Sequence, residues 1–273
     1  MAARGGHVMG ENMLDFSVDH RLDFRGQVVL VTGAGSGIGA AVAEAFGMLG
    51  AKVVAHYGHN REGAEKVVGA IQEAGGTASA VQADLGDPAA AARLVDDVVA
   101  EHGRLDVLVN NAGDLLGRTA IGDMTDEHFA RVMDLNMTSV FATCRQAVAA
   151  MRGQGSGAIV NVTSVAARTG GAGGSVAYAT SKGAVSTFTR GLAKEVATEG
   201  IRVNAIAPGI ITTPFHERHT SEAQMAGMVS GIPMARPGTP EECVGSVLFL
   251  ASPAMSGYVT GQIIEINGGQ LTP

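Results

Sequence analysis

The sequence predicts an α/β protein built on a single doubly wound parallel sheet of about seven strands, with helices on both faces. Short apolar runs alternate with helical patterns from Gln27 to the end of the 273-residue chain. Several of these runs are continuous in Val, Ile and Ala, which is typical of strands buried on both faces of a parallel sheet. The expected strands cover residues 28–32, 52–56, 77–83, 107–110, 158–163, 202–207 and 263–266.

The chain shows no internal repeat and no linker, and its length suits one domain of roughly 200–250 residues with an extension. Residues 1–22 have no clear period, so we expect a flexible arm there and a single domain over residues 23–273. The least regular stretch is about residues 208–238, which contains Pro214 and Pro233, with the candidate lid at about 210–235. It could form a lid over a binding site or an ordinary surface excursion, and periodicity leaves both open.

Composition excludes several classes of protein. Hydrophobic residues make up 46% of the chain and charged residues 16%, which supports a large buried core. The net charge of −7 disfavours nucleic acid or an anionic membrane as the main partner. We find no secretory leader and no run of 18 apolar residues, so a cytoplasmic location is expected. No HExxH or CxxC motif predicts a metal site, and Cys144 and Cys243 are expected to be separate, reduced thiols.

A glycine-rich turn follows the first expected strand. It reads Thr32-Gly-Ala-Gly-Ser-Gly-Ile-Gly39 and leads into an Ala-rich helix. Glycines allow the backbone to approach a pyrophosphate closely, and the helix N-terminus supplies free N–H groups and a positive dipole end. A tight turn without a ligand is the alternative, but the strand–turn–helix setting favours a dinucleotide. The turn residues expected at the cofactor are Gly33, Ser36, Gly37, Ile38 and Gly39.

A second group of residues predicts acid–base chemistry. Tyr178 and Lys182 are four residues apart in a helical stretch and therefore share one face. A free tyrosine has a pKa near 10, and a neighbouring ammonium favours the phenolate, so we predict that Lys182 lowers the pKa of Tyr178. Ser164 follows a strand and could stabilise charge on a substrate oxygen. Ligands bind beyond the carboxyl ends of parallel strands, which would bring Ser164 close to Gly33.

Further motifs complete a resemblance to the short-chain dehydrogenase/reductase family. The glycine turn is followed in order by Asp84-Leu85, Asn110-Asn-Ala-Gly113, Asn136, Ser164, Tyr178-Ala-Thr-Ser-Lys182 and Pro208-Gly209. The resemblance covers about residues 25–269, almost the whole chain. It implies a Rossmann-type fold and an enzyme that transfers hydride between a nicotinamide cofactor and a carbonyl or secondary alcohol.

The resemblance also implies a role for each matching residue. Tyr178 is expected as the acid–base group, Lys182 as a second contact to the nicotinamide ribose, and Ser164 as the residue that orients the substrate. Asn136 is expected to hold a water in a proton relay, although a helical Asn can also serve packing alone. The implied cofactor contacts are Asp84 and Leu85 at the adenine, Asn111, Ala112 and Gly113 along the cofactor, and Pro208, Gly209, Ile211 and Thr213 at the carboxamide.

The end of the second strand bears on the choice of nicotinamide cofactor. NAD-preferring enzymes commonly carry an acidic residue there for the ribose 2′-OH. That position is Tyr57 here, and no carboxylate occurs before Glu62. We expect His56, with His59, Asn60 and Arg61, to surround a 2′-phosphate, so NADP(H) is favoured. NAD(H) stays possible, because Ser36 stands where many NADP enzymes have a basic residue.

The substrate is less well defined. The ending Ala55-His-Tyr57 and the segment Gly261-Gln-Ile-Ile-Glu-Ile-Asn-Gly-Gly269 resemble the 3-oxoacyl-acyl carrier protein reductase-like branch. Sugar and polyol dehydrogenases share this background, and a non-catalytic nucleotide-sensing regulator is a third possibility. Acyl carrier protein is acidic, so Arg118, Arg131 and Arg168 are candidate contacts for it. The glycine-rich loop 169–174 is expected in the substrate wall, and the resemblance implies a homotetramer packed through helices at 126–150 and 175–199.

Overall fold

A computed structural model describes residues 21–272, and the predicted arm at residues 1–22 falls almost wholly outside them. Within this range, parallel strands form one sheet in the order β3-β2-β1-β4-β5-β6-β7. The doubly wound sheet predicted from the sequence is confirmed, and each predicted strand ends within one residue of the observed one. The strands are β1 Val28–Val31, β2 Lys52–Tyr57, β3 Thr77–Gln82, β4 Val107–Asn110, β5 Gly157–Val162, β6 Ile201–Pro208 and β7 Ile263–Ile266.

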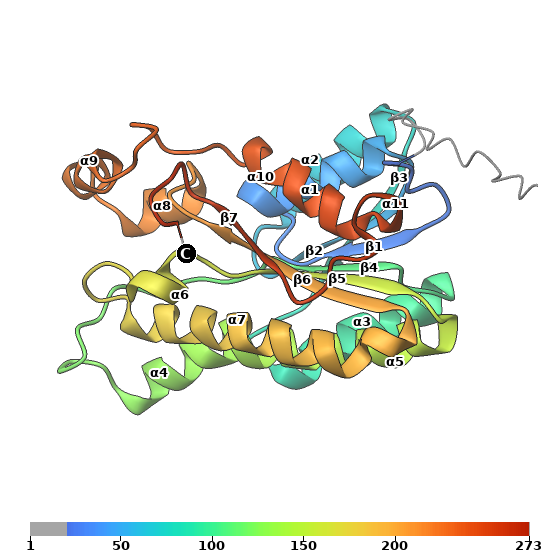
Figure 1. Ribbon diagram of the computed structural model, residues 1–273, viewed down its shortest axis with the longest axis horizontal. Helices are drawn as coiled ribbons and strands as arrows, with labels where there is room; N and C mark the ends of the chain where they lie inside the picture. The colour runs from blue at the N-terminus through green and yellow to red at the C-terminus, as the bar shows by residue number, and fades with distance from the viewer. Residues whose placement is uncertain (1–20, 273) are drawn as a thin grey trace, which may run out of the picture.

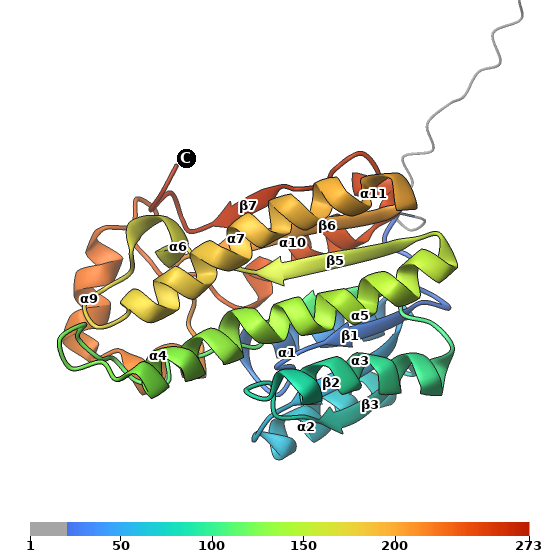
Figure 2. The same cartoon turned by 90° about the horizontal axis from the view of Figure 1, so that it is seen from below.

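Helices cover both faces of the sheet, as Figures 1 and 2 show. One face carries α1 (Gly37–Met48), α2 (Arg61–Glu73), α10 (Glu241–Ala251) and α11 (Pro253–Ser256). The other carries α3 (Pro88–His102), α5 (Ser139–Gln154) and α7 (Val176–Val196), which lie side by side in Figure 2. None of the helices within residues 21–272 is long and apolar enough to cross a membrane.

Each face of the sheet has its own hydrophobic core, because successive side chains along a strand point to opposite faces. In β1, Val29 and Val31 pack with α1, α2 and α10, whereas Val28 and Leu30 pack with α3, α5 and α7. All four side chains are buried, which explains why the strand reads as a continuous apolar run and not as an alternating one.

Helix ends are set by local chemistry. Asp87 caps α3 by accepting the Ala89 N–H at 2.8 Å, and Pro88 occupies the first turn, where its missing N–H costs nothing. A predicted helix at 126–150 is interrupted: α4 (Asp126–Met133) passes into a π-helical turn at Asp134–Thr138 before α5 begins. Such turns are frequent at functional sites, and this one carries Asn136.

The remaining short elements lie near the carboxyl ends of the strands or in the connections. They are α6 (Ala166–Thr169), the 3₁₀ turn Ala197–Glu199, α8 (Pro214–His219) and α9 (Glu222–Ser230). The irregular stretch at 210–235 thus contains two short helices, which stand together at one end of the molecule in Figure 1. We call residues 214–230 the α8–α9 segment.

Candidate active site

A cavity of about 1010 Å³ opens at the carboxyl ends of the strands. Its walls come from the glycine turn (residues 33–39), the ends of β2 and β3, the loops after β4, β5 and β6, and α8. Most of the residues predicted from the sequence therefore meet in one place. Those that line the cavity are Gly33, Ser36, Gly37, Ile38, His56, Tyr57, Asp84, Leu85, Asn111, Ala112, Gly113, Ser164, Tyr178, Lys182, Pro208, Gly209, Ile211 and Thr213.

Two predicted residues lie behind the cavity wall. A Cβ at Gly39 would stand 2.4 Å from the Gly33 carbonyl oxygen and from Asn111 Nδ2, so this glycine lets α1 pack closely on the turn. Asn136 is fully buried, and a Cβ at Gly113 would meet its Oδ1 at 2.6 Å. Gly113, which lines the cavity, thus packs directly against the Asn136 amide.

The glycine turn fits the phosphates of a dinucleotide. Gly37 has a φ of +56°, and a Cβ there would lie 3.0 Å from Cγ2 of Thr213, so the turn and the Pro208–Thr213 loop meet without space for a side chain. α1 begins at Gly37 with no side-chain cap from Ser36 and no acidic residue in its first turn. The positive end of a 12-residue helix therefore faces the cavity with no acidic side chain in its own first turn.

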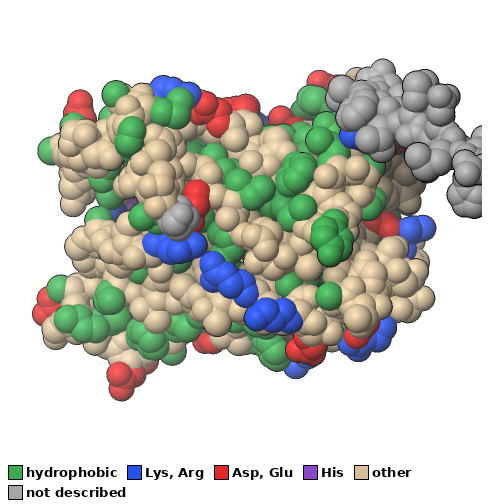
Figure 3. All heavy atoms as spheres, viewed as in Figure 1, with side chains coloured by type: hydrophobic (Ala, Val, Ile, Leu, Met, Phe, Trp, Pro, Cys, Tyr) green, Lys and Arg blue, Asp and Glu red, His purple; other side chains and the backbone are tan. Residues whose placement is uncertain are grey.

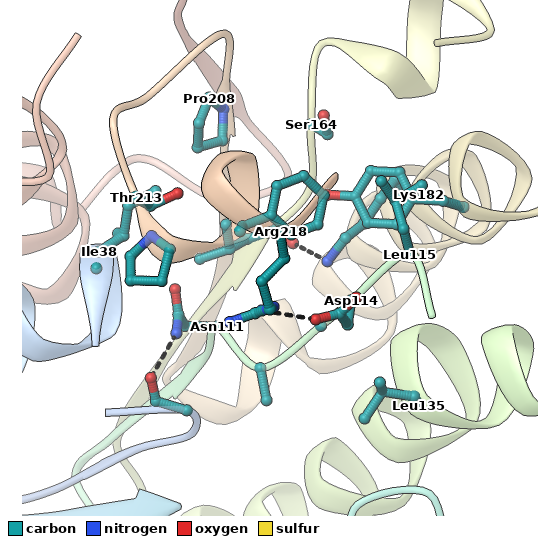
Figure 4. A pocket seen from close by; sticks show the side chains of 18 of the residues that line it. Ile38, Asn111, Asp114, Leu115, Leu135, Ser164, Lys182, Pro208, Thr213 and Arg218 are labelled. Carbon is teal, nitrogen blue, oxygen red and sulfur yellow. Dashed lines mark hydrogen bonds and ion pairs between the residues drawn. The ribbon is translucent and has the colours of Figure 1, made fainter. Parts of the chain in front are cut away.

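Asn111 and Thr32 hold this turn in place. Thr32 Oγ1 accepts the backbone N–H groups of Asn111 and Ala112 at 2.9 and 3.1 Å. In return, Asn111 Nδ2 donates to the carbonyl oxygens of Thr32 at 2.9 Å and Gly33 at 3.2 Å. Figure 4 shows the labelled Asn111 amide in one such bond. The adjacent strands β1 and β4 are thereby joined at the point where the cofactor crevice is expected.

The catalytic candidates lie on α7 and at the end of β5. Lys182 is 2% exposed; its ammonium donates to the Val162 carbonyl at 2.9 Å and stands 5.7 Å from the centroid of the Tyr178 ring. Ser164 lies beside Tyr178 in the cavity, and its Oγ accepts the Ala166 N–H at 3.1 Å. The predicted grouping of a serine, a tyrosine and a lysine is therefore present in one corner of the cavity.

The pKa of Tyr178 shifts in the direction opposite to the one predicted from the sequence. We expected Lys182 to lower it, but burial raises the pKa of the Tyr178 phenol to about 12, against an opposing effect of the hydrogen bond to Ser164. Burial also lowers the pKa of Lys182 to about 8. Desolvation disfavours both charged forms, and at this separation it outweighs the attraction between them. The phenol is therefore held protonated, the form needed to donate a proton.

Asn136 is tied to the loop after β4. Its Nδ2 donates to the carbonyl oxygens of Asp114 at 2.8 Å and Val132 at 2.9 Å, and its Oδ1 accepts the Asp114 N–H at 3.1 Å. Both amide hydrogens are thus engaged with backbone. The side chain fixes the loop that carries Gly113, and the expected relay role stays a prediction.

The residues expected around a 2′-phosphate separate into two groups. His56 is 1% exposed, and both of its ring nitrogens bond backbone groups. Asn60 is also engaged, because its Nδ2 donates to the Gly35 carbonyl at 2.7 Å while its Oδ1 caps α2. Arg61 pairs with Glu65 on the surface. Of the residues in this stretch, Tyr57 and His59 line the cavity without such bonds from their side chains.

A cluster that no sequence pattern indicated closes the opposite side of the cavity. Asp114 pairs through Oδ1 with His219 Nε2 at 2.6 Å and through Oδ2 with Arg218 Nη2 at 2.8 Å, as seen for the labelled Asp114 and Arg218 in Figure 4. Arg118 donates from Nε to the His219 carbonyl at 2.7 Å and from Nη1 to the Gly173 carbonyl at 3.1 Å. These contacts link the loop after β4 with α8 and with the glycine-rich loop at 169–174.

Within residues 21–272, no group of three or more His, Cys, Asp or Glu side chains is arranged to hold a metal ion. What the cavity does contain is a nucleotide-type turn at one end and an acid–base group at the other. A doubly wound sheet with this site defines a nicotinamide-dependent oxidoreductase, in which side chains provide orientation and proton transfer.

Comparison with known proteins gives the same result. The family model described as enoyl-(acyl carrier protein) reductase matches residues 33–270. The chain is 40% identical to the 3-oxoacyl-[acyl-carrier-protein] reductase of Synechocystis sp. over 245 residues, which is 90% of this chain and 97% of the relative. It is 38% identical to the NADPH-dependent aldehyde reductase 1 of Arabidopsis thaliana over 271 residues, covering 96% of this chain and 93% of that protein.

A solved structure of 7α-hydroxysteroid dehydrogenase, complexed with NADH and 7-oxo glycochenodeoxycholic acid, superposes with a TM-score of 0.86. The two are 35% identical, and the match covers 93% of this chain and 97% of the other. The chain therefore belongs to the short-chain dehydrogenase/reductase family, and it is an NAD(P)-dependent oxidoreductase that acts on CH–OH donors or the corresponding carbonyls.

Proposed function

We propose that this enzyme reduces a ketone, 3-oxoacyl or related, with NADP(H) as the preferred cofactor. The observation that carries this proposal is the buried phenol of Tyr178, whose pKa burial raises to about 12, beside Ser164 and Lys182 in the cavity that also contains the glycine turn. A proton donor at neutral pH suits carbonyl reduction, whereas alcohol oxidation first needs the phenol to lose its proton.

The bound cofactor would supply the hydride. Ser164 orients the substrate oxygen by a hydrogen bond and stabilises the charge that develops there. Tyr178 donates its phenolic proton to that oxygen, and the Lys182 ammonium stabilises the resulting phenolate. Asn136 acts behind them, where it fixes the loop with Gly113 and serves a water relay that returns a proton to the site.

The cofactor would extend from Asp84 and Leu85, near the adenine, across the glycine turn to Pro208, Gly209, Ile211 and Thr213 at the carboxamide. Support for NADP(H) comes from the acids that line the cavity in the described chain, which are Asp84 and Asp114. Neither lies on the β2–α2 connection, where an NAD-specific enzyme holds the ribose 2′-OH. His59, Tyr57 and the N-terminal end of α2 are the groups proposed to face a 2′-phosphate.

Apolar side chains support a ketone with an apolar substituent. Leu115, Leu116, Phe215 and Met228 line the cavity, and the Phe215 ring lies 5.6 Å from the Tyr178 ring between centroids. The α8–α9 segment carries Phe215 and Met228, so we propose that it acts as a lid on this substrate. A sugar or polyol substrate is the second candidate, because Asp114, Arg118 and Arg218 line the same region with polar groups.

Acyl carrier protein would be the partner if the natural substrate is a carrier-bound acyl group. Figure 3 shows a row of Lys and Arg side chains across the middle of one face, over the part of the molecule where β7 and α7 lie. Arg131 is exposed at the cavity, whereas Arg168 pairs with Glu265 at 3.7 Å and Arg118 is bound to backbone. Arg131 is therefore the best-placed of the predicted contacts.

We further propose a homotetramer. Large apolar side chains on α4, α5 and α7 are exposed in the single chain, among them Phe129 at 42%, Phe141 at 44% and Val176 at 43%. A second exposed pair is Met255 on α11 and Tyr258 just after that helix. Two separate apolar faces suit two two-fold axes. Light scattering that finds a monomer at micromolar concentration would remove this proposal.

A substrate panel tests the proposed activity. Purified enzyme is assayed with NADPH and with NADH against a 3-oxoacyl thioester, a 3-oxoacyl-acyl carrier protein, small ketones and aldehydes, and, in the reverse direction, polyols and aldonates. Highest kcat/KM on 3-oxoacyl compounds with NADPH supports the proposal. Preference for a polyol replaces it with the second candidate.

A further inference from the structure

His56 stands at the carboxyl end of β2, between the two turns that are expected to hold the cofactor. Its register partner on β3 is Val81, and its side chain is 1% exposed. The Gly33 N–H donates to His56 Nδ1 at 3.1 Å, and His56 Nε2 lies 3.1 Å from the Ala83 carbonyl oxygen. The His56 carbonyl in addition accepts the Ala34 N–H at 2.8 Å.

The partners dictate one protonation state of the ring. A backbone N–H can only donate, so Nδ1 must carry a lone pair. A carbonyl can only accept, so Nε2 must carry the hydrogen. This is the neutral Nε2–H tautomer, and with it every polar atom of the imidazole is used. No nitrogen remains to bind a phosphate, although the residue borders the cavity.

The two bonded turns have different tasks. Gly33 opens the glycine turn, whose backbone is expected at the pyrophosphate. Ala83 immediately precedes Asp84 and Leu85, which line the adenosine end of the cavity. We infer that His56 is a positioning residue, which fixes the distance between the pyrophosphate turn and the adenosine turn and so sets the affinity for the cofactor without touching it. This inference rests on the NAD(P) dependence of the family and not on the proposed substrate.

Acid should weaken this arrangement. A protonated Nδ1 would point a hydrogen at the Gly33 N–H, so the contact would become repulsive. Burial lowers the pKa of His56 below its usual 6.5, and the bond to Ala83 opposes this only in part. The neighbouring titratable groups are Tyr57 on the same strand, His59 in the connection after it, Asp84 after β3, and the surface pairs Arg61–Glu65 and Lys66–Glu62 on α2. Residues 33–39 contribute none. The bond is therefore intact at pH 7 and above, and it is lost only at pH values below the usual pKa of a histidine.

Binding of both cofactors to His56 variants tests the inference. Dissociation constants for NADPH and for NADH are measured by titration between pH 5 and pH 8, for the wild type, His56→Leu and His56→Asn. His56→Leu should raise the dissociation constants of NADPH and NADH by the same factor, which is at least tenfold at pH 8. His56→Asn keeps an acceptor for the Gly33 N–H and should recover most of that loss. The wild-type affinity should fall towards pH 5, and the Leu variant should lose this pH dependence.

Each alternative has its own signature. If His56 contacts the 2′-phosphate, the variants lose affinity for NADPH and not for NADH, and the inference is wrong. It is also wrong if His56→Leu binds both cofactors like the wild type, or if the Asn variant is as weak as Leu. His102→Asn is the matched control, because His102 is a largely buried histidine at the end of α3, outside the cavity. If His56→Leu does not fold, the inference is still tested by the cofactor affinities of His56→Asn and by the pH dependence of the wild-type affinity. Failure to reduce any ketone in the panel would leave these binding results unaffected, so the two proposals fail separately.

Discussion

The Asp114 carboxylate and the His219 imidazole lie 2.6 Å apart, although 105 residues separate them in the sequence. The backbone of Asp114 is bonded at the same time to the amide of Asn136. Asp114 thus connects the α8–α9 segment to Asn136, the buried catalytic candidate. Burial opposes ionisation of Asp114, but the Leu116 N–H, Arg218 and His219 together keep the pKa of its carboxyl low.

Asp114→Asn should therefore weaken substrate binding more than turnover. The amide keeps the backbone bonds to Asn136 but loses the charge that holds Arg218 and His219. Because the Arg218 side chain is 55% exposed and screened by solvent, we expect a loss of about 1 kcal/mol, or roughly fivefold in KM. Steady-state kinetics with limited proteolysis of the α8–α9 segment checks this. An unchanged KM, or a collapse of kcat, would contradict it.

Tyr178→Phe should abolish the proton transfer and spare the nucleotide site. General acid catalysis contributes about 10²–10⁴-fold, so turnover should fall within that range or below detection. The dissociation constant for the cofactor should stay within about twofold of the wild type. Comparing initial rates with cofactor titrations tests both statements. Full activity in the variant would refute the mechanism, and a wild type that binds cofactor but reduces nothing would favour a nucleotide sensor.

Lys182→Met should inactivate the enzyme and stabilise the fold. The folded pKa of Lys182 is about 8 against 10.5 in a free side chain, so burial of the charge costs about 3 kcal/mol at pH 7. The variant also loses the hydrogen bond to the Val162 carbonyl, which costs about 1 kcal/mol. Its free energy of unfolding should therefore exceed that of the wild type by about 2 kcal/mol. Urea denaturation at pH 7 measures it. The exposed Lys194 on the same helix is the control, and its replacement by Met should change stability little.

The same lysine predicts a pH dependence. Because the pKa of Lys182 is lowered, its charge costs stability below about pH 8, and this cost disappears as pH rises from 8 to 10.5. Catalysis should show the opposite trend, since the ammonium that stabilises the phenolate is lost above pH 8. The kcat/KM for reduction of a non-ionising ketone should thus decline with an apparent pKa near 8. A profile that stays level up to pH 10 would exclude this role.

Cofactor preference gives the fifth prediction. NADPH should bind at least ten times more tightly than NADH, a difference of about 1.4 kcal/mol. The physical reason is the absence of a carboxylate at the end of β2, combined with His59 and the start of α2 nearby. Direct titration of both cofactors at pH 7 and pH 8 provides the measurement. Equal or reversed dissociation constants would establish an NAD enzyme or one without preference.

The fold was accessible from the sequence because its signals are local. Continuous apolar runs and capped helices are properties of neighbouring residues, and the glycine turn combines a strand end with a helix start. The candidate catalytic residues Ser164, Tyr178 and Lys182 were found because they follow the order that the family resemblance predicts. Their approximate meeting place then follows from the rule that ligands bind at the carboxyl ends of parallel strands.

What the sequence did not reveal depends on contacts across space. The Asp114 cluster joins residues 105 positions apart, and no composition or periodicity marks the π-helical turn at Asn136. His56 was expected at a phosphate because it lies at the end of the second strand, where the cofactor ribose is usually bound, yet its ring is enclosed by backbone donors and acceptors. The pKa of Tyr178 was misjudged because the spacing to Lys182 was known and the burial of both was not.

The link between Thr32 and Asn111 also bears on how the chain is made. Strands β1 to β3 and their helices are complete by residue 102, but the glycine turn gains its clamp only once residues 111 and 112 are available. Ser164, Tyr178 and Lys182 are translated later still. Synthesis therefore completes the residues of the nucleotide turn and its clamp before those of the candidate proton donor, although a domain generally folds as a unit.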